Sequence, residues 1–197
     1  TTAPAHTLYD IVRKLPEGAQ VQMESGGDGS QLAIRAGRSR FTLATLPRDD
    51  FPATGSGELP HRFQIAPGEM RALIDRTRFA ISTEETRYYL NGIYLHAHVS
   101  GETPVLRAVA TDGHRLARVE MPLPMGASEI PGVIVPRKTV AELRKLIDET
   151  SEPIEMALSD TRVRFSFDQV VLTSKLIDGT FPDYQRVIPS GNDKVLK

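Results

Sequence analysis

A helix followed by three strands and a Phe-Pro dipeptide is the repeated pattern that most constrains the fold of this chain. Pro4 begins the first copy and residues 51–52 end it, while Pro136 begins the second copy and residues 181–182 end it. A third helix-plus-strands unit without the dipeptide, residues 63–122, lies between them. Any α+β protein shows loose self-similarity, but here the match extends to the dipeptide. Helix-plus-strand units that recur along a chain predict a tandem α+β architecture.

The predicted helices are three segments whose apolar residues recur at positions i, i+3, i+4 and i+7. Each begins beside a proline, which the first turn of a helix tolerates because the N–H that proline lacks has no partner there. Between the helices the hydrophobic period drops to two, which is typical of half-buried strands, and short loops join these strands into antiparallel meanders. The helices are expected at residues 4–15, 67–79 and 136–148, and the strands at residues 20–24, 32–34, 41–45, 93–99, 105–110, 117–121, 154–158, 163–167 and, by the repeat, 171–175.

The predicted helices are basic although the chain as a whole is not. The sequence has 24 Lys and Arg against 25 Asp and Glu, which argues against a strongly basic nucleic-acid-binding protein. Within the three helices, however, there are nine basic and five acidic side chains. A basic helical surface on an otherwise acidic protein suits weak, sequence-independent contact with phosphates. The alternative is three solvated amphipathic helices.

Residue types and segments that are absent exclude several kinds of function. The sequence has no Cys, which excludes a disulfide scaffold, a thiolate nucleophile and a Cys-ligated metal, and fits a reducing compartment. No stretch approaches 18 apolar residues and the first residues lack the regions of a signal peptide, so we expect neither a membrane span nor a secretory signal. Both ends lack natural boundaries, so we expect a piece of a longer protein. Residues 46–61, rich in Pro and Gly, are the expected linker.

Residues 111–116, Thr-Asp-Gly-His-Arg-Leu, form the sharpest local motif. Asp112 and His114 are candidates for an acid–base or metal pair, but a metal needs more ligands. The Gly-x-Ser-x-Gly elbow of many hydrolases, a phosphate loop and a dinucleotide fingerprint are all missing. An Asp-Gly pair between two predicted strands is more simply explained as a turn.

Two pairs of side chains on predicted strands leave alternatives open. His96 and His98 are spaced i, i+2 on one face of a strand, which is possible ligand geometry, but no carboxylate cluster accompanies them. Tyr88 and Tyr89 are expected at a strand start, where adjacent side chains point to opposite faces. One tyrosine can then stack on bases or lie against a nucleic-acid backbone while the other packs. Two half-buried strand tyrosines explain the pair equally well.

The chain resembles the bacterial sliding clamps, the beta subunits of DNA polymerase III, in five motifs that occur in order along its length. These motifs are Gly-Arg-Ser-Arg-Phe at residues 37–41, Arg-Tyr-Tyr-Leu-Asn-Gly at 87–92, Ala-Thr-Asp-Gly-His-Arg-Leu-Ala at 110–117, Val-Pro-Arg-Lys at 135–138 and Phe-Pro-Asp-Tyr at 181–184. The resemblance implies the DNA clamp fold, in which tandem similar domains have outer antiparallel sheets and inner helices. It implies that residues 1–57 are the C-terminal half of clamp domain 1, residues 58–188 the complete domain 2, and residues 189–197 the start of domain 3.

The resemblance also implies a function without catalysis. In that family two three-domain subunits form a homodimer ring that encircles double-stranded DNA and tethers the replicative polymerase. The implied partners are the DNA polymerase III alpha subunit, the clamp loader, other polymerases and repair proteins, with no metal, cofactor or membrane. The implied location is the bacterial cytoplasm, in association with the nucleoid. Because both ring-closing surfaces would be incomplete, we expect that these 197 residues alone do not form a stable ring.

Site residues follow from the resemblance by matching motifs. The family binds short apolar peptide motifs of its partners in a pocket whose matching residues here are Leu90, Thr111, Gly113, His114, Arg115, Leu116, Pro182, Arg186 and Val187. The residues that match DNA contacts are Arg87, Tyr88, Tyr89, Arg137 and Lys138. Two other functions remain as alternatives: a hydrolase that uses Asp112 and His114, and an interaction module that has lost ring closure.

Overall fold

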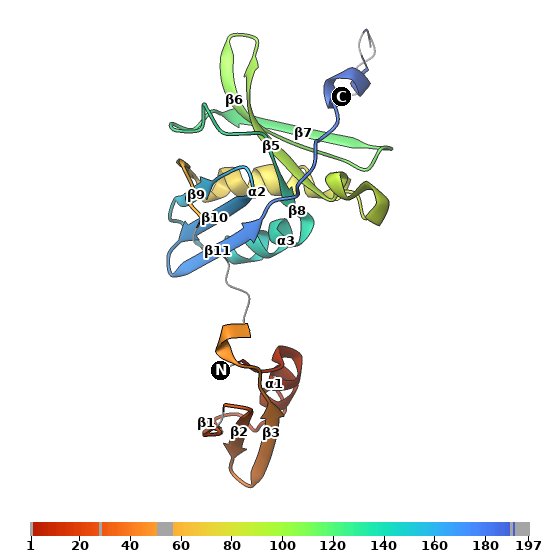
Figure 1. Cartoon of the computed structure of the whole chain (residues 1–197). Helices are drawn as coiled ribbons and strands as arrows, with labels where there is room; N and C mark the ends of the chain where they lie inside the picture. Colours follow the sequence, from red (N-terminus) through yellow and green to blue (C-terminus); the bar gives the residue numbers. More distant parts are fainter. Residues whose placement is uncertain (1, 28, 51–56, 190, 192–197) are drawn as a thin grey trace. The chain divides into compact units, whose positions relative to one another are not determined.

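The computed structural model describes residues 2–27, 29–50, 57–189 and 191, which fall into two compact units, residues 1–55 and 56–197. Figure 1 shows their elements, and each unit is described by itself. The first Phe-Pro dipeptide and most of residues 189–197 lie outside the described residues. Among the residues described, no helix is long and apolar enough to cross a membrane.

The first unit is one helix and a three-stranded antiparallel sheet. Helix α1 (Ala5–Val12) is followed by β1 (Gln22–Ser25), β2 (Gln31–Ala36) and β3 (Ser39–Ala44), in the sheet order β1-β2-β3, and by the short 3-10 helix η1 (Arg48–Asp50). Its core is Leu32, Ile34 and Leu43, against which Leu8 and Ile11 of the helix pack. The predicted order of helix and three strands is confirmed. The prediction that the first strand is half-buried is wrong, because all four residues of β1 are exposed.

The second unit consists of two halves that have the same order of helix and strands. The first half comprises β4 (His61–Ile65), α2 (Pro67–Asp75), η2 (Arg78–Ala80), η3 (Glu85–Leu90), β5 (Gly92–Ser100), β6 (Thr103–Thr111) and β7 (Leu116–Pro122). The second comprises β8 (Val133–Pro136), α3 (Arg137–Leu146), β9 (Ile154–Leu158), β10 (Arg162–Phe167) and β11 (Val170–Lys175), and the 3-10 helix η4 (Tyr184–Val187) follows it. The predicted order of helix and three strands therefore recurs in both halves, and each copy is preceded by a strand, β4 or β8, that the sequence repeat did not include.

The two halves exchange their first strands. The two four-stranded sheets have the orders β11-β10-β9-β4 and β7-β6-β5-β8, so β4 pairs with the second half and β8 with the first. In the antiparallel registers, Phe63 is opposite Met156 and Ile93 is opposite Val135. Because each sheet needs a strand from both halves, neither half can complete its sheet alone.

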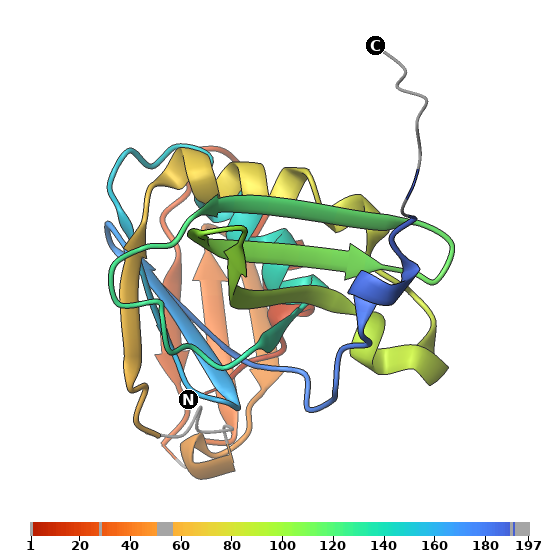
Figure 2. The ribbon, with the colours of Figure 1, turned by 90° about the horizontal axis from the view of Figure 1, so that it is seen from above.

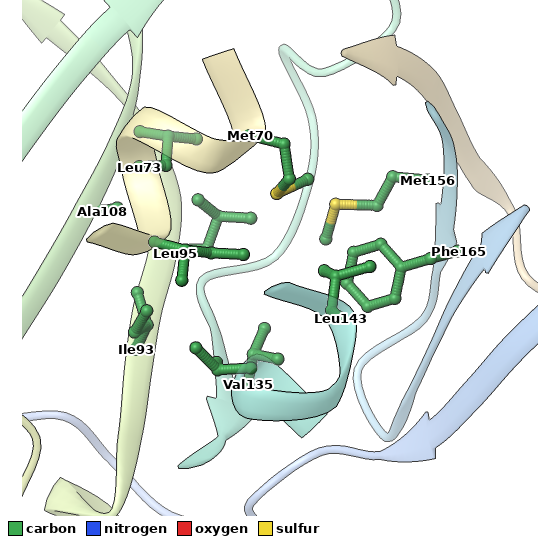
Figure 3. A pocket seen from close by; sticks show the side chains of 11 residues that line it. Met70, Leu73, Ile93, Leu95, Ala108, Val135, Leu143, Met156 and Phe165 are labelled. Carbon is green, nitrogen blue, oxygen red and sulfur yellow. The ribbon is translucent and has the colours of Figure 1, made fainter. Parts of the chain in front are cut away.

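One hydrophobic core joins both sheets and both helices. Figure 3 shows Met70 of α2 and Leu143 of α3 pointing toward Met156 and Phe165 of the β11-β10-β9-β4 sheet, while Leu73 of α2 lies on the other side, near Leu95 of β5 and Ala108 of β6. A cavity of about 30 Å³ remains among these apolar side chains. A space of this size lined only by apolar atoms offers no hydrogen bonds to a water molecule. It is a packing gap in the core and not a ligand site.

Candidate functional site

Residues 177–188 cover the outer face of the sheet that contains β5 and β6. Side chains alternate along β5, so that Ile93 and Leu95 enter the main core while Tyr94 and His96 point to the opposite face. On that face Phe181 and Tyr184 pack against Leu90, Val109 and Ile134. Figure 2 shows η4, in dark blue, lying beside η3 and this sheet. Two segments that are distant in the sequence therefore meet here.

A cleft of about 270 Å³ lies where these segments meet. Five of the predicted pocket residues line it: Leu90, Thr111, Gly113, Pro182 and Val187. Arg87 and Tyr89, which were predicted as DNA contacts, also line it, together with Asp183 and Tyr184, which sequence reasoning did not select. The signal for these last two was present, because both belong to the Phe-Pro-Asp-Tyr motif.

Four predicted pocket residues lie outside the lining of the cleft. Leu116 packs into the cluster beneath it. His114 and Arg115 are exposed on the hairpin between β6 and β7, and the Arg186 side chain is 84% exposed on η4. The Arg115 guanidinium lies over the exposed Phe79 ring, 5.9 Å from its centroid. The lining is therefore mainly apolar, with polar side chains around it.

Asp112 organises the hairpin and is not available as a general base. Its Oδ1 accepts hydrogen bonds from the N–H groups of His114 and Arg115 at 2.9 and 3.0 Å, and its Oδ2 accepts one from Arg115 Nε at 2.9 Å. These hydrogen bonds, led by the backbone N–H of Arg115, lower the pKa of Asp112 to about 2. Gly113 follows with φ of +90°, a conformation that side-chain-bearing residues rarely adopt. The geometry is that of a turn, which argues against the hydrolase alternative.

The loop before the cleft is held by an ion pair. Arg87 donates hydrogen bonds through Nε and Nη2 to the Glu84 carboxylate at 2.8 and 2.9 Å, and this hydrogen bonding raises the pKa of Arg87. The prediction that Tyr88 and Tyr89 begin a strand is wrong, because both lie in η3. Tyr88 is 53% exposed and Tyr89 is half-buried, and both lie beside Gly179.

Four of the nine basic side chains of the predicted helices are already paired with carboxylates, Arg13 with Asp10 among them. Arg144 contacts Asp75 and Asp148 at 2.9 and 3.0 Å, Arg78 contacts Asp75 at 3.3 Å and Lys145 contacts Glu142 at 2.9 Å. Among the residues that the structure describes, the exposed side chains of Lys14, Arg76, Arg137 and Lys138 have no carboxylate partner, and the half-buried Arg71 donates to the carbonyl of Ile147 at 2.7 Å. The free cationic surface on these helices is therefore smaller than the residue count suggests.

The described residues contain no cluster of three or more side chains that could hold a metal ion. Both ring nitrogens of His96 are within hydrogen-bond distance of protein atoms: Nδ1 is 2.9 Å from the carbonyl of Ala97 and Nε2 is 3.0 Å from the hydroxyl of Tyr184. The predicted possibility that His96 and His98 share a metal ion therefore has no further ligands among these residues.

Two family models match the chain. The model for "DNA polymerase III beta subunit, N-terminal domain" matches residues 1–55, and the model for "DNA polymerase III beta subunit, central domain" matches residues 64–183. The beta sliding clamp of Caulobacter vibrioides is 59% identical to this chain over 195 residues, and that of Escherichia coli is 41% identical to it over 199 residues. These alignments cover 99% and 100% of this chain but 52% of each relative, so the chain spans about half the length of the curated relatives it matches.

The solved structures to which this chain is similar are also sliding clamps. The crystal structure of the Caulobacter crescentus beta sliding clamp with PEG bound matches with a TM-score of 0.89 at 59% identity, over 98% of this chain and 51% of that one. A sliding clamp from Bartonella birtlesii bound to griselimycin matches with a TM-score of 0.88 at 53% identity, over 97% and 51% of the two chains.

Proposed function

Because the chain belongs to the DNA polymerase III beta subunit family, we propose that it is part of a sliding clamp, a ring that encircles duplex DNA and tethers the replicative polymerase. Its fold is the clamp fold, with antiparallel sheets and helices in a repeated α+β order. In this proposal residues 1–57 are the C-terminal half of domain 1, residues 58–188 are domain 2 and residues 189–197 begin domain 3. The extents of the family matches and of the two compact units support this division.

The cleft between the Thr111–Leu116 hairpin and η4 is the observation that carries the proposal. It is a concave site with an apolar lining and a few polar groups, which suits a short apolar peptide segment. Its proposed occupants are motifs of the polymerase alpha subunit, the clamp loader, other polymerases and repair proteins. The ring itself would be a homodimer of full-length subunits in the bacterial cytoplasm. The chain would provide positioning and no chemistry of its own.

Replacing Val187 by aspartate tests this cleft. The side chain of Val187 is 69% exposed at the rim, so the fold should tolerate the change, whereas an apolar peptide would meet a charge. We expect the dissociation constant of a fluorescently labelled polymerase-derived peptide to rise about tenfold. Val99→Asp is the matched control, because Val99 is similarly exposed, at 61%, and does not line the cleft. Equal affinities for the two variants would count against the site.

The unpaired cations at the start of α3 give a second test. If Arg137 and Lys138 contact phosphates, replacing both by glutamine should reduce the slope of log affinity for duplex DNA against log salt by about two. The measurement is fluorescence anisotropy of labelled DNA at several salt concentrations. Lys145→Gln is the control, since Lys145 lies on the same helix but is paired with Glu142. A slope that stays the same in the double variant would remove these two residues from the DNA contact.

A further inference from the structure

A buried hydrogen-bond network joins the wall of the cleft to three strands. The Tyr184 hydroxyl on η4 accepts a hydrogen bond from Arg107 Nη1 at 2.8 Å and lies 3.0 Å from His96 Nε2. Arg107, on β6, is only 3% exposed, and its Nε and Nη2 reach Glu120 Oε1 on β7 at 2.9 and 2.7 Å. None of the family motifs quoted above includes His96, Arg107 or Glu120.

The geometry assigns the protons in this network. A carbonyl oxygen only accepts, so His96 Nδ1 carries the proton that it donates to the carbonyl of Ala97. In the neutral ring Nε2 is then an acceptor. Because arginine only donates, the Tyr184 oxygen accepts from Arg107 and its O–H is donated to His96. Every group in this chain of hydrogen bonds is satisfied when His96 is neutral.

Protonation of His96 disrupts this arrangement. A second N–H at Nε2 would point at the Tyr184 hydroxyl, which would lose the acceptor for its own hydrogen. It would also place a positive charge near Arg107, and a buried polar group without a partner is unfavourable.

Besides Tyr184, two aromatic rings and two charged side chains, Arg107 and Glu120, surround His96. Tyr94 stacks on the ring with centroids 4.7 Å apart, and the ring of His98 lies 5.8 Å away. Burial is the main cause that lowers the pKa of His96, and the charges of Arg107 and His98 act in the same direction. The hydrogen bond to the Ala97 carbonyl and, more weakly, the carboxylate of Glu120 oppose them. The neutral ring is therefore the form at neutral pH. The stability that it contributes is fully present above the pKa of an unfolded histidine, about 6.5, and is lost as the pH falls below that value and through the lowered pKa of His96.

Tyr184 is a principal anchor of the wall to which it belongs. It is 5% exposed, whereas Val187 is 69% exposed and the side chains of Asp183 and Arg186 are 62% and 84% exposed. The other buried anchor is Phe181, whose ring stacks on Tyr94 at 4.8 Å. The position of residues 182–187 therefore depends strongly on how the Tyr184 side chain is held.

We propose, on the basis of the peptide-binding function above, that His96 and Arg107 are positioning residues for Tyr184, and that protonation of His96 loosens the wall at residues 182–187 and weakens peptide binding. Neither residue lines the cleft, so they act through Tyr184. Through this network, peptide binding in the cleft depends on the protonation of His96, although His96 is not one of the lining residues.

Nuclear magnetic resonance of the full chain tests the coupling directly. In a titration from pH 8 to about pH 4.5, which extends well below the ordinary histidine pKa because that of His96 is lowered, the amide signals of residues 183–187 should shift with the same midpoint as the His96 ring signals. In His96→Gln, whose amide oxygen can accept from Tyr184 but does not titrate, these shifts should disappear. His98→Gln should keep them. Tyr184→Phe, which retains the ring, should remove the coupling and increase hydrogen exchange at residues 185–187 at every pH.

Peptide affinity measured at both ends of this range gives the functional result. The loss of about one hydrogen bond corresponds to an affinity that is about fivefold weaker at the lower pH in the unaltered chain, with no matching change in His96→Gln. His114 is present in both proteins, so it cannot account for a difference between them. The inference would be overturned if the amide signals of residues 183–187 shifted with a midpoint different from that of His96. It would also be overturned if peptide affinity depended on pH equally in His96→Gln and in the unaltered chain. Coupled wall signals with no peptide binding at any pH would confirm the network and overturn the peptide-binding function.

Discussion

Replacing Leu143 by alanine is expected to lower the free energy of unfolding of the second unit by about 2–5 kcal/mol. Leu143 is 2% exposed and lies between both sheets on the inner face of α3 (Figure 3). Its removal would enlarge the existing gap of about 30 Å³, and the β4–β9 and β5–β8 pairings limit how far the surroundings can collapse. Urea denaturation followed by tyrosine fluorescence suits this measurement, because four of the five tyrosines lie in this unit.

Leu146→Ala is the control for this experiment. It makes the same chemical change on the same helix, but Leu146 is 42% exposed. We expect it to lower the free energy of unfolding by less than about 1 kcal/mol. Similar losses for the two variants would show that α3 does not bury the face assigned to it.

Replacing Gly113 by valine is expected to weaken peptide binding by about thirtyfold or more. A Cβ at this position would lie 2.6 Å from Nη1 of Arg87, which also lines the cleft. The φ of +90° adds backbone strain for a β-branched residue. The side chain would therefore both fill the cleft and displace its neighbours, which a peptide titration measures directly.

Gly101→Val separates strain from occlusion. Gly101 also has positive φ, +64°, in the hairpin between β5 and β6, but a Cβ there would meet nothing within 4 Å. Both valine variants should lose stability, and only Gly113→Val should lose peptide affinity. If Gly101→Val weakened binding as much, the effect at Gly113 would be a general loss of folding.

Local pattern was sufficient to predict most of the elements. The apolar period predicted all three helices and most of the strands, and β9 occupies the predicted residues 154–158. Helix α1 ends at Val12 and not at the predicted residue 15, since the chain must already turn before Pro16. Strands β4 and β8 were not predicted, although Phe63 and Ile65 alternate in the expected way. The buried run of β8 is too short to show a period.

Interactions between distant residues could not be predicted in this way. The exchange of β4 and β8 depends on pairings between residues about 90 and 40 positions apart, which no local period encodes. The same applies to the ion pair of Arg144 with Asp75, which reduces the free positive charge of the helices. Tyr88 and Tyr89 lie in η3 beside the Glu84–Arg87 ion pair, where side-chain alternation predicted a strand. The motifs located the cleft, but the buried Arg107 that holds its wall lies outside them.

The peptide-binding cleft is tested by mapping where a polymerase-derived peptide contacts the chain, through amide chemical-shift changes in the full 197-residue protein. We expect shifts confined to three segments, residues 87–90, 111–116 and 181–188, which are brought together only by the fold. Shifts centred on any other surface, or saturable binding that leaves these three segments unchanged, would contradict it.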